Sequence, residues 1–399
     1  MLYKLSKSVF PCMMLTLCIG FCYAFSLFTP HIAESIGYSV ESVQFTFCLN
    51  IFFLGMGAAM FGPLAERRIK SAALLSASLL TVGLLLGGLA CNLKSMWTMY
   101  LGCGVVAGLA EGIGYVTPNK NMLLWFPRSR FKGILSAVSI FSFGLGSTLC
   151  SWLFGLMFPS LGMERMFYAL AGLYAIPSFL SAFLIDKPLY ALLKLERRTE
   201  SGFSYAETAR DRFFQKSWVF MFLNISMGLV LIGSCATIMG DLGLSSTMVI
   251  TIMMLCGIFN GLGRIVFPAI ADLTGNKRVV WLLTILIEVI LMIPVIYSYH
   301  THSMILTAAL CIVLIHACYG SAFACLPIVL AEHYGKDTLS QRHGFCLTSW
   351  GMASLMAYLC TTFVLKNFSG FGIVMGCVLV GYLINTFVAI SICRSDKVS

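Results

Sequence analysis

Charged residues are scarce in this 399-residue chain: Asp, Glu, Lys and Arg make up 11% of it, whereas hydrophobic residues make up 59%. Soluble domains carry about 25% charged residues, so the composition excludes an ordinary soluble protein. The formal net charge of +10 would suggest a nucleic-acid partner in a soluble protein. In a membrane protein it is explained by basic cytoplasmic loops. We therefore predict an integral protein of the lipid bilayer with no nucleic-acid partner.

Enzyme signatures are also missing from the sequence. It contains no P-loop, no H-E-x-x-H and no G-x-S-x-G, and Gly261-Leu-Gly263 lacks the strand and helix that a dinucleotide fingerprint needs. The 16 cysteines form no C-x-x-C pair and no cluster with zinc spacing. These absences predict a protein that is not an enzyme and uses no metal or cofactor. Without a P-loop, an ion or substrate gradient must drive any transport.

Long apolar runs fill most of the chain, and each is long enough to cross a bilayer, which takes about 20 residues. They lie at about 8–30, 42–63, 71–91, 96–124, 133–158, 165–185, 217–237, 247–270, 279–297, 303–330, 344–365 and 371–391. One long hydrophilic segment, 186–216, separates six runs from six. The pattern predicts an all-α membrane protein of twelve transmembrane helices. We expect an N-terminal six-helix bundle (1–185), a cytoplasmic linker (186–216) and a C-terminal six-helix bundle (217–399).

The distribution of basic residues predicts the orientation. With the N-terminus inside, 21 of the 26 Lys and Arg residues fall in inside segments and 3 fall in outside loops. Cytoplasmic loops are enriched in Lys and Arg. We therefore expect a multi-pass protein of the cell membrane with both termini in the cytoplasm, and we expect it to be a monomer.

The two halves resemble each other at an offset of 206 residues. The segment from Gly55 to Ala65 aligns with the segment from Gly261 to Ala271, and Glu66 then aligns with Asp272. Such a duplication with parallel repeats is typical of major facilitator transporters, whose substrate site lies between the halves near mid-membrane.

Arg264 lies inside the eighth apolar run, opposite Ala58 in the repeat alignment, so the repeat itself needs no arginine there. It precedes Asp272 by eight residues, or about 12 Å of helix, which is far for snorkelling to the surface. An arginine at mid-membrane costs at least about 2.5–3.5 kcal/mol on insertion scales. Its planar guanidinium can donate two parallel hydrogen bonds to a carboxylate. We predict that Arg264 binds an anionic substrate; a structural ion pair with Glu111 is the alternative.

Three polar residues of the fourth run share one helical face: Glu111, Tyr115 and Asn119. Glu111 is either a proton-coupling group or a buried hydrogen-bond partner. In the tenth run, the equivalent of the fourth, His316 precedes Tyr319 by one turn, and a histidine there could carry a proton or serve as an interior hydrogen-bonded residue. Glu288, in the ninth run, is better explained by structural pairing.

Several segments resemble the oxalate–formate antiporter branch of the major facilitator superfamily, which is itself similar to the monocarboxylate transporters. The resemblance rests on an ordered set of motifs spread over nearly the whole chain. They are Gly20-Phe-Cys-Tyr23-Ala24-Phe-Ser26-Leu-Phe28, Val43-Gln44, Gly112-Ile-Gly114-Tyr115 through Pro118 to Trp125-Phe126-Pro127, Arg130, Gly133, Phe143-Gly144-Leu-Gly146, Gly261-Leu-Gly263-Arg264, Phe323 to Pro327, and His343-Gly344 to Thr348-x-Trp350-Gly351.

The resemblance implies transport of a small carboxylate by alternating access, with Arg264 contacting the anion. Trp350 occupies the place where the oxalate exchanger has a lysine, which argues for a monocarboxylate rather than a dianion. The loops after the second and eighth runs match the family's gating-loop motif, although the first is shortened. The matching residues are Glu66, Arg67, Asp272, Lys277 and Arg278.

Together these arguments predict a secondary transporter for a small organic anion such as formate, lactate or pyruvate. We expect Arg264 to bind the carboxylate while Tyr23, Tyr115, Asn119, Tyr319 and Trp350 line the cavity. Glu111 or His316 would carry a proton if transport is symport; anion exchange is the other possibility. The rivals are a carrier of a neutral or aromatic solute, drug efflux, and a non-transporting membrane sensor.

Overall fold

The computed structural model describes residues 2–125, 132–188, 203–274, 277–335, 339–368 and 370–395. Within these ranges it describes all side chains except those at positions 2, 66, 119, 120, 122–124, 132–137, 139 and 340.

The first half of the chain is helical throughout its described part. Its elements are α1 (Leu2–Lys7), α2 (Val9–Ile19), the 3₁₀ segment η1 (Gly20–Ala24), α3 (Phe25–Ile36), α4 (Val40–Arg67), α5 (Ile69–Leu93), α6 (Met96–Met99), the π-helical segment η2 (Tyr100–Val106), α7 (Ala107–Trp125) and α8 (Lys132–Leu184). The chain reverses within α8 at Gly162, whose backbone is non-helical (φ 68°, ψ −179°). A residue without a Cβ adopts this positive φ readily.

The second half contains only helices in its described part. They are α10 (Tyr205–Arg210), α11 (Arg212–Asp241), α12 (Ser246–Leu273), α13 (Val279–Thr301), α14 (Ile305–Tyr334), α15 (Leu339–Cys346), α16 (Thr348–Asn367) and α17 (Phe371–Cys393). Polar N-cap residues mark the start of several of these helices. The Asp211 carboxylate accepts a hydrogen bond from the Phe214 N–H (2.7 Å) at the start of α11, and Ser245 caps α12 in the same way.

Eleven described helical stretches are long and apolar enough to cross a membrane. One of them, Ile140–Leu184, has 45 residues and includes the reversal at Gly162, so it makes two passes. The predicted all-α membrane architecture is confirmed, and eleven to twelve membrane-length helices in the described residues stand against the twelve predicted. Helices satisfy their own backbone hydrogen bonds, which is what a chain inside a bilayer requires.

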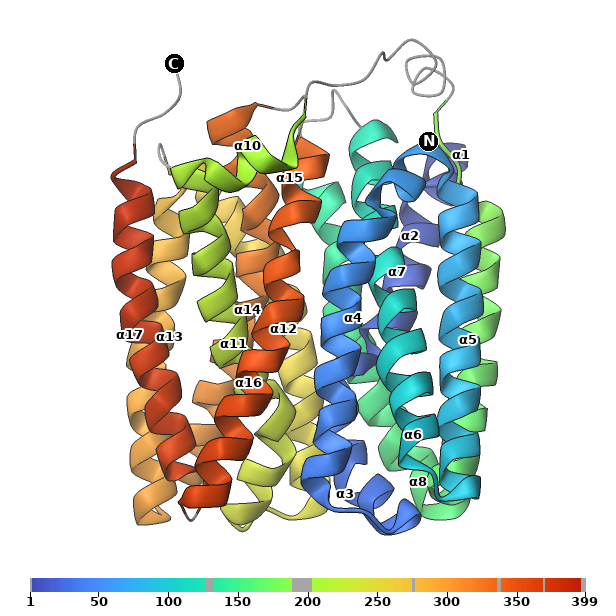
Figure 1. Ribbon diagram of the computed structural model, residues 1–399, viewed down its shortest axis with the longest axis vertical. Coiled ribbons are helices and arrows are strands. Elements are labelled where there is room, and N and C mark those ends of the chain that lie inside the picture. Colours follow the sequence, from blue (N-terminus) through green and yellow to red (C-terminus); the bar gives the residue numbers. More distant parts are fainter. Residues whose placement is uncertain are drawn as a thin grey trace.

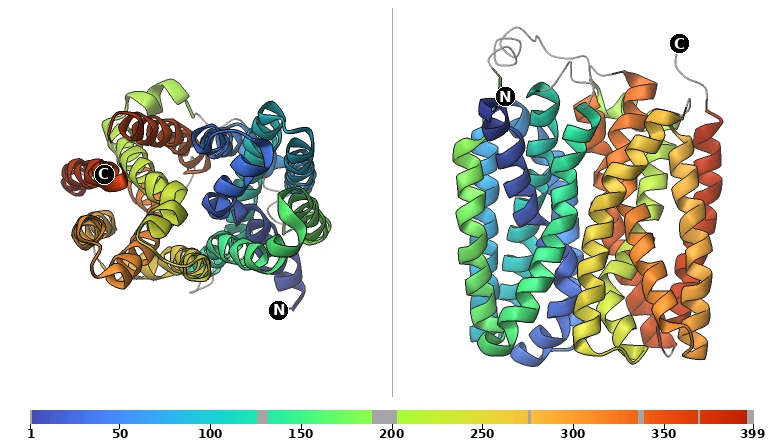
Figure 2. Two further views of the ribbon diagram at one scale, coloured as in Figure 1. Left: turned by 90° about the horizontal axis from the view of Figure 1, so that it is seen from below. Right: turned by 180° about the vertical axis from the view of Figure 1, so that it is seen from behind.

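The helices form two groups that stand side by side, one from each half of the chain (Figures 1 and 2). Helix α1 and the end of α17 lie at the same end of the molecule, which we call the termini end (Figure 1). The predicted cytoplasmic location of this end stays a prediction.

Glycines bring the two groups into contact along their seam. Helix α8 packs against α12, and α4 packs against α16. A Cβ on Gly144 would lie 2.5 Å from the Gly261 nitrogen, and one on Gly55 would lie 2.5 Å from the Gly351 nitrogen. Backbone touches backbone at both crossings, as small residues permit in membranes. Gly55 and Gly261, which the repeat alignment pairs, each contact the opposite half here.

Candidate functional site

Arg264 lies on α12 at the seam and is fully buried. Its Nε donates a hydrogen bond to Oδ1 of Asn260, one turn earlier (3.1 Å). The guanidinium carbon lies 5.1 Å from the ring centre of Phe143 and 5.4 Å from that of Phe323. Cation–π contacts of this kind stabilise an arginine that has left water. Among the described residues no carboxylate forms a salt bridge with Arg264.

An aromatic cluster drawn from both halves surrounds this cation. The Tyr23 and Tyr319 hydroxyls are hydrogen-bonded to each other across the seam (3.0 Å). Tyr115 and Trp350 meet edge to face with ring centres 5.2 Å apart. The ring centres of Phe323 and Trp350 are 4.3 Å apart. The structure thus brings together five residues that the sequence nominated separately. They are Arg264, Tyr23, Tyr115, Tyr319 and Trp350.

This cluster holds more hydrogen-bond donors than acceptors. Both Nη groups of Arg264, Nδ2 of Asn260, Nε1 of Trp350 and the hydroxyl of Tyr115 are buried, and none makes a hydrogen bond of ordinary geometry in the described part of the chain. The Trp350 indole nevertheless interacts with the Tyr319 hydroxyl. The Tyr115 hydroxyl lies next to the Arg264 guanidinium. A buried donor without an acceptor costs about 1–3 kcal/mol, so an acceptor-rich group placed here would be stabilised. A carboxylate has only acceptors, about four lone-pair sites on two oxygens.

The cluster is closed to solvent in this structure, since each of its side chains is buried. A small cavity of about 40 Å³ lies between the halves, toward the end away from the termini. Its polar lining is uncharged and comes from α3, α4, α11 and α16: Ser26, Thr29, Gln44, Ser234, Ser354, Tyr358 and Thr361.

Glu111 is fully buried on α7 but belongs to a different contact. Its Oε1 accepts a hydrogen bond from Nδ2 of Asn50 (3.1 Å), and that Nδ2 also donates to the Cys103 carbonyl (2.9 Å). The alternative in which Arg264 pairs with Glu111 finds no support in these contacts.

His316 precedes Tyr319 on α14 and is 5% exposed. Its Nδ1 lies 2.7 Å from the Ile312 carbonyl one turn earlier. A carbonyl only accepts, so Nδ1 carries the hydrogen and Nε2 is left to bind or release a proton.

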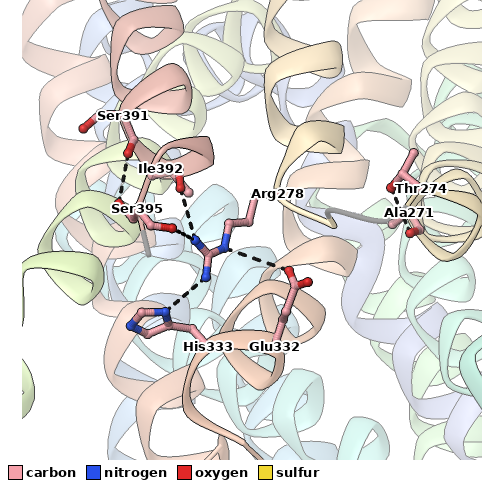
Figure 3. Close-up of polar contacts among 8 residues, drawn as sticks. All are labelled: Ala271, Thr274, Arg278, Glu332, His333, Ser391, Ile392 and Ser395. Carbon is pink, nitrogen blue, oxygen red and sulfur yellow. Dashed lines mark hydrogen bonds and ion pairs between the residues drawn. The ribbon is translucent and has the colours of Figure 1, made fainter. Parts of the chain in front are cut away.

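The predicted gating-loop residues separate into two groups. Lys277 and Asp272 form an exposed pair (3.5 Å). Arg278 is instead buried: it donates to the carbonyls of Ile392 and Ser395 at the end of α17 and contacts Nδ1 of His333 (3.1 Å; Figure 3). It therefore ties α13, α14 and α17 together. Arg67 is exposed, while the side chains of Glu66 and Asn119 lie outside the described residues.

Sequence reasoning missed three members of the site. Phe143 and Phe323 stack on Arg264, yet a phenylalanine inside an apolar run has no distinguishing signal. Asn260 was detectable, because a polar residue four positions before an arginine lies on the same helical face.

Two helical bundles that meet around a buried polar site are the architecture of a membrane transporter. The chain belongs to the Major Facilitator Superfamily, whose family model matches residues 9–358. It is 27% identical over 346 residues to the uncharacterized MFS-type transporter YhjX of Escherichia coli (strain K12), covering 84% of this chain and 82% of that protein. It is 22% identical over 345 residues to the oxalate:formate antiporter of Oxalobacter formigenes, covering 84% and 79%.

Solved structures agree with this fold. A D-xylose-proton symporter superposes with a TM-score of 0.75 at 14% identity, covering 97% of each chain. A partially occluded, inward-open form of the xylose transporter XylE from E. coli gives 0.70 at 12% identity, covering 98% of this chain and 97% of that one. The protein is thus a multi-pass membrane transporter of the major facilitator fold.

Proposed function

We propose that this transporter moves a small organic monoanion, a monocarboxylate such as formate, lactate or pyruvate, by alternating access between its two halves. The proposal rests on the surplus of buried donors around Arg264. A carboxylate placed there would accept from the two Nη groups and from neighbouring donors on both halves. Binding would then draw the halves together around the substrate.

The single cation of the cluster supports a monoanion over a dianion. Arg264 supplies one positive charge, and its neighbours in the cluster are uncharged. A second carboxylate on the substrate would enter a buried site without a charge partner, which is costly. The relative from Oxalobacter formigenes carries organic anions by its name, which supports the anion class for this chain.

Coupling to protons or to a counter-anion is the second part of the proposal. Glu111 and His316 are the candidates for carrying a proton if transport is symport. Neither residue forms a salt bridge among the described residues, so either could change its protonation without breaking an ion pair. Exchange of one anion for another would need no such group.

The test is uptake of labelled formate, lactate, pyruvate and oxalate into proteoliposomes with and without a pH gradient. Wild type is compared with Arg264→Gln, Arg264→Lys and, as a control, with Arg165→Gln, which removes an exposed cation of α8. Each charge-assisted hydrogen bond is worth about 1.5–3 kcal/mol, so losing two lowers affinity by roughly 100-fold or more. Ligand-induced thermal stabilisation, measured on the same samples, separates lost binding from lost folding.

Uptake of a monocarboxylate that Arg264→Gln abolishes and Arg165→Gln preserves supports the proposal. Equal uptake by wild type and Arg264→Gln refutes it and favours a neutral or aromatic solute, or drug efflux. The lysine variant tests whether binding depends on the geometry of the guanidinium as well as on its charge. An ammonium keeps the positive charge but loses the planar pair of donors.

A further inference from the structure

Glu111 is a buried carboxyl group of the first half. A second one lies in the other half, which carries Arg264. Glu288 is on α13, an outer helix of the second group (Figure 2). Its side chain is nevertheless fully buried, and it bonds to α11 inside the bundle rather than facing lipid. Nothing in the transport mechanism proposed above uses it.

The surroundings of Glu288 hold more acceptors than donors, the reverse of the Arg264 cluster. Its Oε2 accepts a hydrogen bond from Nδ2 of Asn224 on α11 (2.8 Å). Glu288 Oε1 and Asn224 Oδ1 are both buried and have no partner in the described part of the chain. The hydroxyl of Tyr382 on α17 is also buried without a partner. One further proton on the carboxyl group would supply the donor that these oxygens lack.

No cation among the described residues forms a salt bridge with Glu288. The salt bridges of the second half, within the described residues, join Lys277 to Asp272 and Arg278 to Glu332. The described titratable groups that interact with Glu288 include Cys318 on α14 and Tyr382 on α17, both uncharged when protonated, and α11 contributes the neutral Asn224. An isolated carboxylate at this depth is strongly disfavoured. Glu288 is therefore neutral in this closed state.

The carboxyl group lies close to the central cluster. Tyr382 is within electrostatic range of both Glu288 and Tyr319. Tyr319 packs its ring on Gly228 of α11, one turn after Asn224; a Cβ there would lie 2.1 Å from the ring. Tyr382 is therefore near both Glu288 and Tyr319 of the Arg264 cluster, although its hydroxyl forms no hydrogen bond to either of them.

We propose that Glu288 is a proton-binding site of the second half, which loads a proton in the closed state and releases it by way of Tyr382 and Tyr319 when the central site opens. On opening, the Tyr382 hydroxyl must first come within hydrogen-bond distance of Glu288 and Tyr319, because it makes neither bond in the closed state. The Glu288 O–H bond then breaks, and each tyrosine hydroxyl gives up one proton as it receives another. The proton passes to the bound carboxylate or to water, and Glu288 is left as a carboxylate until it is reprotonated. This inference rests on the proposed anion transport and assigns it a proton partner.

The amide variant Glu288→Gln tests the site with little structural change. Glutamine can accept from Asn224 Nδ2 and donate to Asn224 Oδ1, so it imitates a protonated carboxyl group. We expect its Tm to match that of wild type. A large loss of Tm would mean that Glu288 is ionised and paired, which overturns the proposal.

Infrared spectroscopy of the membrane-embedded protein reads the proton directly. The wild type should show the C=O stretch of buried protonated carboxyl groups, and Glu288→Gln should lose one component. Glu111→Gln, which alters the other amide-bonded carboxyl group, serves as the matched comparison and should leave the Glu288 component in place. An unchanged spectrum in Glu288→Gln overturns the inference, whether or not the protein transports a monocarboxylate.

Proteoliposome uptake then tests coupling. For one-to-one symport, a pH gradient of one unit supports about tenfold accumulation of a monoanion. Glu288→Gln should lose this accumulation and keep exchange of labelled for unlabelled substrate; Tyr382→Phe should slow the accumulation. Wild-type accumulation by Glu288→Gln refutes the coupling role alone. Absence of any monocarboxylate uptake by the wild type refutes the proposed function instead.

Discussion

The closeness of the two halves can be tested at Gly144. A Cβ added there would lie 2.5 Å from the Gly261 nitrogen, 2.7 Å from the Gly261 Cα and 2.9 Å from the Gly257 carbonyl oxygen. All three atoms are backbone, so no side chain can rotate away. Ordinary contact begins at 3.4 Å, which means that α8 and α12 must separate by about 0.9 Å in Gly144→Ala.

Two opposing terms decide the stability of this variant. Forcing an extra methyl group into a packed contact costs about 1–3 kcal/mol, whereas replacing glycine by alanine inside a helix gains about 0.8–1.0 kcal/mol. Gly172→Ala is the matched control: it lies on the same helix, is exposed, and a Cβ there has no atom within 4 Å. The control should therefore be more stable than Gly144→Ala by about 1–3 kcal/mol.

The assay is thermal unfolding of both variants in one detergent, together with uptake. Gly172→Ala should have the higher Tm and wild-type uptake. Gly144→Ala should have the lower Tm and reduced uptake, because the two halves can no longer close fully at the seam. Equal Tm values would refute the reasoning, because they would show that the seam at Gly144 is looser than the backbone distances require.

Two further predictions concern stability. Tyr319→Phe leaves the buried Tyr23 hydroxyl without its partner at a cost of about 1–3 kcal/mol, so we expect a lower Tm; an unchanged Tm would show that the bond across the seam contributes nothing. Arg278→Gln removes the bonds that fasten the end of α17 and should lower the Tm markedly, whereas Lys277→Gln, at an exposed pair, should change it little. Similar losses in both would contradict the buried role of Arg278.

Much of the fold follows from the sequence because the membrane imposes one strong rule: every spanning segment must be apolar and helical. The runs at 133–158 and 165–185 are a partial exception, since they continue into one long α8 whose direction changes at Gly162. The backbone angles of a single glycine between two apolar runs cannot be predicted from the sequence. The orientation in the membrane is predicted by charge and is untested by the structure.

The site was predictable only where a residue was out of place in its segment. Arg264 could be predicted as a site residue because placing an arginine at that depth in the membrane costs free energy. Glu288 was expected to have a structural partner. That Asn224, 64 residues away, is hydrogen-bonded to it depends on how α11 and α13 pack. The surplus of donors around Arg264 and of acceptors around Glu288 exists only once the helices are assembled, so no spacing in the sequence could reveal it.

The glycine crossings at Gly55–Gly351 and Gly144–Gly261 have a mechanical consequence. At these two points backbone meets backbone, so the glycines themselves place no side chain in the way of a rolling motion, although Phe141, Ser147 and Thr148 of α8 pack beside the second crossing. Resistance to reorientation comes from the side-chain contacts around them. These are the Thr148–Met254 and Ser354–Cys48 hydrogen bonds across the seam, and the interlocked rings and the Tyr23–Tyr319 bond at the centre. In the proposed mechanism, an anion bound at the central cluster would rearrange those rings and so lower part of this barrier.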